Sequence, residues 1–240
     1  MNFIILFLFF ILNINYSFGF VNLSKVSLKT NRSLMIDQNI LPDFTNALIV
    51  NGIGYTVLKE SKQKNLTQKG LVHAAALGTG LMTFLGWKGY TLCVFYFILG
   101  SAVTKIKMKQ KQCEGIAEKN DGARGPANVW GSAAVAMIFA ILSYLNKESS
   151  ELFKLAYVTS ISTKLTDTFQ SEVGKAFGKN TFLVTNLSKV PRGTEGAISI
   201  EGTLAGILAS IIINVGAYKL GIIDENKEIL ISVVSSQVAT

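Results

Sequence analysis

Residues 191–206 join charged side chains to an apolar segment that is long enough to cross a membrane. The stretch carries Arg192, Glu195 and Glu201 among four glycines. An ionised group at the centre of a bilayer costs at least about 2.5–3.5 kcal/mol, so Glu201 at the mouth of an apolar helix indicates a site. The glycines indicate backbone that must approach something closely.

Residues 166–175 offer ligands for a divalent cation. Asp167 closes an apolar run, and Glu172 and Lys175 follow it. Mg²⁺ takes one or two carboxylates together with substrate phosphates. Because Glu172 lies about 140° round a helix from Asp167, both can bind one ion only if the helix ends between them. The alternative is that Asp167 caps a helix and the other charges are solvated.

Residues 122–131 form a phosphate-binding pattern in which glycines surround Arg124 just before a helix begins. Free N–H groups at a helix N-terminus attract phosphate, and arginine binds it through two hydrogen bonds. Lys105 ends an earlier apolar run, as a phosphate ligand or as a lysine that reaches the interface. Glu118 is either a metal ligand or a solvated charge.

Composition predicts an integral membrane protein. Of the 240 residues, 49% are hydrophobic and 16% charged, and the mean hydropathy is +0.39. The net charge of +8 fits basic loops beside membrane helices better than nucleic-acid binding. The absence of a GxxxxGK[ST] loop, a kinase signature set, HExxH and GxSxG argues against the soluble nucleotide-fold enzymes.

The expected fold is all-α, a polytopic transmembrane bundle of about six to seven membrane helices. Each apolar run is bounded by polar or glycine-rich residues, and the first is a weak span or a re-entrant segment. The runs are 44–58, 71–86, 91–103, 129–145, 153–165, 197–218 and 229–238.

The basic connectors are expected to share one side of the membrane. If 71–86 and 91–103 form a hairpin, the connectors 59–69, 105–128 and 166–195 all face one compartment. We expect the chemistry on that face.

The N-terminus has the composition of a targeting sequence. Residues 1–19 contain a ten-residue apolar run with small residues after it, typical of a signal peptide, although a first membrane anchor is the alternative. Residues 20–42 are basic, rich in hydroxyls and poor in acids, like a plastid transit segment. The expected location is therefore a complex-plastid membrane, with residues 43–240 as a multi-pass membrane domain.

Five motifs, in this order, carry a family resemblance. Together they resemble the plastid phytyl-phosphate kinases of vitamin E synthesis, within a wider group that includes cyanobacterial and archaeal relatives and animal transmembrane protein 19. The resemblance covers about residues 44–238. The motifs are Gly-Ser-x-x-Thr-Lys (100–105), Glu-Gly-Ile-Ala-Glu (114–118), Gly-Pro-x-Asn-Val-Trp-Gly (125–131), Asp-Thr-x-x-Ser-Glu-x-Gly-Lys (167–175) and Pro-Arg-Gly-Thr-Glu-Gly-Ala-x-Ser-x-Glu-Gly-Thr-x-Ala-Gly (191–206).

Two departures from the family pattern stand out. The family has Arg-Arg before the Gly-Pro, where this chain has Ala123-Arg124. The family also continues past the pattern at 236–239 through a further span, so we expect the membrane domain to be truncated at its C-terminus.

The resemblance implies an enzyme, a phosphotransferase that converts phytyl phosphate to phytyl diphosphate for tocopherol and phylloquinone synthesis. It implies Mg²⁺, a nucleoside triphosphate (CTP, UTP or ATP) and a prenyl phosphate lipid as partners in the membrane, and no nucleic acid. The implied catalytic residues are Asp167, Glu172, Arg192 and Glu201. The implied phosphate-binding residues are Lys105, Arg124, Asn128, Lys175, Gly193 and Thr194, and the implied metal ligands are Asp167, Glu172 and Glu118.

Three other functions stay open at this stage. A kinase of the free prenyl alcohol, phytol, needs a base such as a carboxylate or His73, which is more often a polar contact in a helix core. A transporter of anionic lipids or metabolites often shows paired repeats with broken helices, and residues 44–58 are the candidate broken helix. A membrane scaffold without activity needs none of the motif charges.

Overall fold

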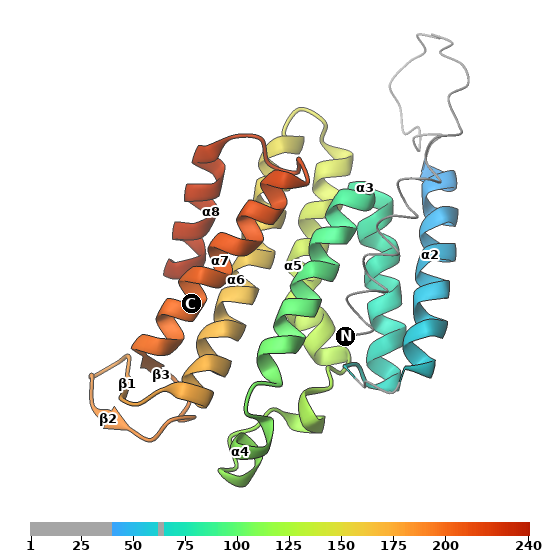
Figure 1. Cartoon of the computed structure of the whole chain (residues 1–240). Helices are drawn as coiled ribbons and strands as arrows, with labels where there is room; N and C mark the ends of the chain where they lie inside the picture. Colours follow the sequence, from blue (N-terminus) through green and yellow to red (C-terminus); the bar gives the residue numbers. More distant parts are fainter. Residues whose placement is uncertain (1–39, 62–64) are drawn as a thin grey trace, which may run out of the picture. The chain divides into compact units, whose positions relative to one another are not determined.

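The computed structural model describes residues 40–61 and 65–240, which belong to one unit, Gln38–Thr240. The predicted signal peptide at 1–19 and nearly all of the predicted transit segment at 20–42 lie outside the described residues. Figure 1 shows a bundle of roughly antiparallel helices with a small sheet at one end. The elements are α2 (Ile40–Glu60), α3 (Gln68–Thr104), α4 (Met108–Cys113), η1 (Lys119–Gly122), α5 (Pro126–Leu145), α6 (Ser150–Phe177), β1 (Thr181–Leu183), β2 (Lys189–Val190), β3 (Ala197–Ser199), α7 (Ile200–Lys219) and α8 (Asn226–Val238).

Helix α3 contains the predicted hairpin. Its backbone leaves helical geometry at Gly86, with φ 66°, a region that glycine enters without the steric cost of a side chain. The chain reverses there, so that two arms of α3 run side by side (Figure 1). The prediction placed this turn at residues 87–90, directly after the glycine that makes it.

The all-α membrane class is confirmed. Within the described residues, α3, α5 and α7 are long and apolar enough to cross a membrane. The expected six to seven membrane helices counted both arms of α3 together with α2, α6 and α8. Helix α8 has 13 residues, which is about 20 Å of helix and less than the hydrocarbon core of about 30 Å.

The largest difference from the predicted elements is the end of helix α6. The helix continues to Phe177, whereas the predicted apolar run ends at residue 165. Its buried positions continue at helical spacing through Leu165, Thr166, Glu172 and Ala176. Since two of these four side chains are polar, the apolar periodicity fades while the helix goes on. The residues expected in a loop are therefore held on a rigid helix.

Two smaller differences from the prediction concern the start of the first helix and the last polar connector. Helix α2 is continuous and begins at Ile40, three residues before the predicted domain boundary; Pro42 is tolerated in its first turn, where the backbone N–H has no helical partner. An antiparallel sheet has the strand order β2-β1-β3; β1 and β2 lie within the last polar connector and β3 follows it. Phe182 of β1 pairs with Lys189 and with Ile198.

Helix α6 lies at the centre of the bundle and packs against α5, α7 and α8. Its residues Tyr157, Ile161 and Leu165 are fully buried. On α7, a Cβ added at Gly202 would stand 2.5 Å from the Gln170 carbonyl oxygen of α6. The predicted small-residue packing face of α7 is therefore the surface on which α6 and α7 meet.

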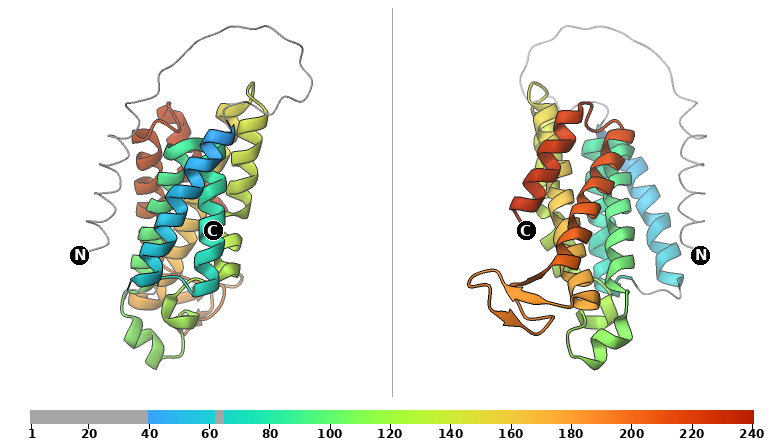
Figure 2. Two further views of the ribbon diagram at one scale, coloured as in Figure 1. Left: turned by 90° about the vertical axis from the view of Figure 1, so that its right-hand side faces the viewer. Right: turned by 60° about the vertical axis from the view of Figure 1, so that its left-hand side comes forward.

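The three basic connectors meet at one end of the bundle, as predicted. Thr67 N donates to Arg124 O at 3.1 Å, and Lys105 donates to Asn65. Lys175 Nζ lies 3.5 Å from Glu118 Oε1. Figure 1 and the right-hand view of Figure 2 show the sheet and α4 at this same end.

We expect Gly202→Ala to destabilise the bundle and Gly54→Ala to leave it unchanged or more stable. The first substitution forces a methyl group against backbone, an overpacking that costs about 1–3 kcal/mol. The second places it on α2, where no atom lies within 4 Å and alanine is the better helix former. Thermal unfolding in detergent measures both, and equal midpoints for the two variants would contradict the close α6–α7 contact.

Candidate functional site

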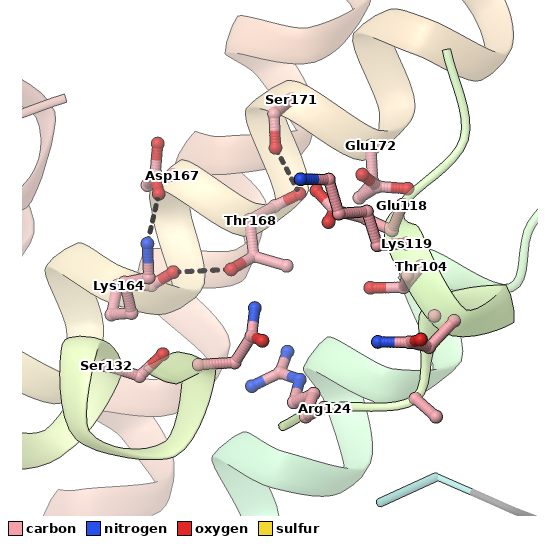
Figure 3. Close-up of a pocket in the computed structure, with 14 residues that line it drawn as sticks. Thr104, Glu118, Lys119, Arg124, Ser132, Lys164, Asp167, Thr168, Ser171 and Glu172 are labelled. Atoms are coloured by element: carbon pink, nitrogen blue, oxygen red, sulfur yellow. Dashed lines mark hydrogen bonds and ion pairs between the residues drawn. The ribbon is translucent and has the colours of Figure 1, made fainter. Parts of the chain in front are cut away.

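A polar cavity of about 230 Å³ opens at the basic end of the bundle, between the end of α3, the loop around η1, the start of α5 and the second half of α6. Five residues predicted from the sequence line it together. They are Glu118, Arg124, Asn128, Asp167 and Glu172. In Figure 3, Arg124 faces Lys164, Asp167 and Thr168 of α6 across the cavity.

A second cavity of about 420 Å³ adjoins the first and is lined by the glycine-rich loop before α7. Lys175, Gly193 and Thr194 line it, as the sequence predicts for phosphate-binding residues. Asp167 and Ser171 line both cavities. The two cavities therefore form one polar region with Asp167 at their junction.

Arg124 contacts aromatic rings and occupies space that a glycine leaves free. Its Nη1 donates to Tyr96 Oη at 2.8 Å, and its guanidinium carbon lies 5.3 Å from the Tyr96 ring centre. A Cβ at Gly100 would overlap the other guanidinium nitrogen. In the described part of the chain, no carboxylate lies within ion-pair distance of Arg124. The cavity therefore presents a fixed positive charge that an anion can neutralise.

Glu172 is buried and bound by two lysines. Its side chain is 2% exposed; Oε2 accepts from Lys111 Nζ at 2.5 Å and Oε1 from Lys175 Nζ at 3.1 Å. Lys111 is 1% exposed and also donates to Thr104 O at 2.7 Å. Burial of a charge is tolerated only with such partners, so this carboxylate already has cations on both oxygens.

Asp167 has the opposite environment. Its side chain is 51% exposed, and its Oδ2 accepts from Lys164 Nζ at 2.7 Å, one turn earlier on α6. Because α6 continues through both positions, Asp167 and Glu172 point to different sides of the helix. The condition for one ion shared by this pair, that the helix ends between them, is not met.

The cavity offers carboxylates for Mg²⁺ without a complete set of ligands from the protein. No group of three or more His, Cys, Asp or Glu side chains gathers among the residues that the structure describes. Asp167 and Glu118 line the cavity and are about half exposed. One or two carboxylates completed by phosphate oxygens is the usual Mg²⁺ site of phosphate-transferring enzymes, so this donor set fits an ion that arrives with a nucleotide.

Three predicted residues lie outside both cavities in the described structure. Lys105 donates to Asn65. Glu201 accepts from the Lys179 backbone N–H at 3.4 Å. Arg192 Nε donates to Glu114 Oε2 at 2.8 Å, and a second guanidinium nitrogen binds the other carboxylate oxygen. Their direct roles in catalysis stay predictions.

The Arg192–Glu114 pair holds the loop that lines the second cavity. Gly193, with φ 83°, lies so close to Ile116 that a Cβ would stand 2.5 Å from its Cγ2. Hydrogen bonds from Arg192 and Gln110 hold the pKa of Glu114 below its ordinary value. Arg192 thus positions Gly193 and its neighbours instead of entering the cavity.

Two more predicted residues have contacts within the helices. Trp130 Nε1 donates to His73 Nδ1 at 2.9 Å, with the rings in an edge-to-face arrangement. This agrees with His73 as a polar contact in the core. Asn128 Oδ1 accepts from Gly125 N at 3.3 Å, so Asn128 caps the start of α5 while it lines the cavity.

Sequence reasoning missed two lysines of this region. Lys164 lines the cavity and pairs with Asp167, and the three-residue spacing of opposite charges was its signal. Lys111 lies in a run of alternating lysines, and nothing local distinguishes the one that is buried.

Comparisons with known proteins give one consistent result. Residues 52–240 match the family model described as integral membrane protein DUF92. An uncharacterized membrane protein of Synechocystis sp. is 48% identical over 187 residues, 78% of this chain and 72% of its own length. A relative in Arabidopsis thaliana, described as Protein VTE6, chloroplastic, is 41% identical over 211 residues, 86% of this chain.

The archaeal relative is more distant. An uncharacterized membrane protein of Methanocaldococcus jannaschii is 31% identical over 183 residues, 76% of this chain and 73% of its own length. The match to the Arabidopsis protein spans 63% of that protein's length. No solved structure matches the chain significantly.

We expect Lys111→Met to destabilise the protein strongly, because it leaves Glu172 buried with half of its charge compensation. Removal of one partner from a buried ion pair costs about 3–5 kcal/mol. The double variant Lys111→Met/Glu172→Leu is expected to recover much of that loss, since no unpaired charge is buried. Unfolding midpoints of the single and double variants in detergent measure the coupling, and additive losses would contradict it.

We expect the loop at 191–197 to loosen in acid. Because the pKa of Glu114 is lowered in the folded protein, its contribution is complete above the ordinary glutamate pKa of about 4.3 and is lost as the pH falls through the lowered value. Hydrogen exchange of the Thr194 and Ala197 amides, which are bonded within the loop, measures this. Glu114→Gln is the control, whose protection is expected to be lower and independent of pH; parallel pH dependence in both proteins would contradict the assignment.

Proposed function

This chain belongs to the DUF92 family of integral membrane proteins, and we propose that it is a prenyl-phosphate kinase. In the proposed reaction, phytyl phosphate and a nucleoside triphosphate give phytyl diphosphate and a nucleoside diphosphate, with Mg²⁺. The observation that carries the proposal is the guanidinium of Arg124, uncompensated within the described structure, in a cavity that also holds exposed carboxylates at the polar end of a membrane bundle.

The chemistry suits the groups in the cavity. A phosphate oxygen of the lipid attacks the terminal phosphorus of the nucleotide, a new P–O bond forms, and the bond to the bridging oxygen breaks with the nucleoside diphosphate as leaving group. The attacking oxygen is already ionised, so the step needs no strong base. It needs cations that bring two anions together and stabilise the charge of the transition state.

The residues divide between the two cavities. Arg124 and Lys164 face the first cavity and would neutralise the phosphate of the lipid. Lys175 lines the second cavity with Gly193 and Thr194, and these residues would hold the nucleotide phosphates. Asp167, at the junction, and Glu118 would hold Mg²⁺, which would supply charge neutralisation to the transferring phosphoryl group.

The proposal extends to the place of the protein in the cell. The family and its apolar helices establish membrane association, and the Arabidopsis relative is described as chloroplastic. With the transit-like composition of residues 20–42, these observations support a complex-plastid membrane. They also support synthesis of a phytyl-derived quinone or tocopherol as the use of the product.

The alternatives receive less support from the site. A kinase of free phytol needs a base beside the hydroxyl group. Of the two kinds of base that the sequence offered, His73 Nδ1 is taken by the Trp130 N–H, which leaves a carboxylate such as Asp167. A transporter with a broken helix at 44–58 is not favoured, because α2 is continuous there.

We expect membranes that contain the protein to form phytyl diphosphate from phytyl phosphate and labelled nucleotide, with CTP, UTP and ATP supplied separately. Loss of one fixed donor to a transition-state oxyanion costs about 10²–10³-fold in rate, so Arg124→Gln is expected to lower kcat/KM by that factor. Lys219→Gln is the matched control, an exposed cation at the other end of α7. Turnover of phytol but not of phytyl phosphate, or full activity of Arg124→Gln, would refute the proposal.

A further inference from the structure

An apolar groove on the side of the bundle leads into the polar site. It lies between α5, α6 and α8, with a volume of about 610 Å³. Val135 on α5, Leu152 on α6 and Ile231 on α8 form walls that are 49–64% exposed. Apolar surface of this extent needs an apolar partner, either the lipid bilayer at large or one specific molecule.

The groove is continuous with the polar cavity. Ser132, Lys164 and Asp167 line both the groove and the first cavity. Asp167 also lines the second cavity, so all three hollows share this residue. A molecule in the groove would thus have one end beside the cations of the site and the rest against apolar helix surface.

Two threonines inside the groove bond their hydroxyl groups to carbonyl oxygens of their own helix. Thr159 Oγ1 donates to Leu155 O at 2.8 Å, and Thr163 Oγ1 donates to Thr159 O at 2.9 Å. Their hydroxyl groups are satisfied along α6. The groove therefore offers a hydrocarbon chain few unsatisfied polar groups to desolvate along α6.

We propose that this groove holds the isoprenoid tail of the lipid substrate, with its phosphate at Lys164 and Arg124. The proposal rests on the proposed function and adds the path of the tail. The occupant follows from charge and length. One end of the groove is cationic, which suits a phosphate, and Leu152 and Asp167 are separated by about 22 Å of helix, which suits a tail of several isoprene units better than a short one.

Gly131 and Ala156 allow the length of the groove to be changed. A Cβ added at Gly131 has no atom within 4 Å, so a larger side chain there fills the groove near Lys164 without a clash. Ala156 lies three turns before Asp167, about 16 Å along α6. Bulk at Ala156 should exclude only long tails, and bulk at Gly131 should hinder nearly all of them.

The test measures turnover of prenyl monophosphates with one to four isoprene units. For Ala156→Trp we expect KM for the longest substrate to rise about tenfold or more, as expected for apolar groups that lose their pocket, with short substrates unaffected. Gly131→Leu should raise KM for every length above one unit. The control is Gly54→Leu on α2, a helical glycine with equally open surroundings. Equal losses at all lengths, or no change in any variant, would overturn the groove assignment.

A second measurement separates this inference from the proposed function. Val135→Cys, in a background without Cys93 and Cys113, is labelled with a membrane-permeant maleimide, and Ile49→Cys on α2 is the control. Phytyl phosphate should slow labelling at position 135 and not at 49. Protection without any turnover would keep the groove and refute the kinase; turnover without protection would do the reverse. A cysteine that is unreactive at 135 while the control at 49 reacts, before substrate is added, would show that another part of a longer chain, or a second copy, covers the groove.

Discussion

A fully buried charge needs groups that neutralise it, and the buried Glu172 carboxylate has a lysine on each of its oxygens. Its carboxylate is 2% exposed and contacts Lys111 and Lys175, and Lys175 in turn reaches Glu118. These contacts tie α6 to α4 and to the loop before η1. The polar cavity is built on this cluster, since Glu172 and Glu118 form part of its wall and Lys175 continues into the neighbouring cavity.

Helix α6 connects this cluster to the rest of the protein. Its apolar residues form the centre of the core, and its last turns carry the polar site. Because one rigid helix carries both, Asp167 keeps a defined position relative to Arg124 and to the groove that begins beside it. Two faces of α6 have different roles. Glu172 faces inward and pairs with its lysines, whereas Asp167 faces the open cavity.

Arg192, whose catalytic role stays a prediction, makes one of the outer contacts of the site. Arg192 binds Glu114 and holds the glycine-rich loop against Ile116. Two glycines also position parts of the site. Gly100 leaves room for the Arg124 guanidinium, and Gly202 lets α7 approach α6. Arg192 and Gly100 thus shape the cavities without lining them, whereas Gly202 also lines the second cavity.

The sequence by itself determined the membrane class, the positions of most helices, the family and the end of the bundle at which the polar groups gather. Hydrophobic runs, basic connectors and ordered motifs are local signals, and five candidate residues did reach one cavity. Only the tertiary structure decided which charges meet. Arg192 and Glu114 are 78 positions apart, and Lys111 and Glu172 are 61 apart, so no local pattern pairs them. The extension of α6 to Phe177 was equally hidden, because its buried face there includes polar residues whose partners come from distant segments.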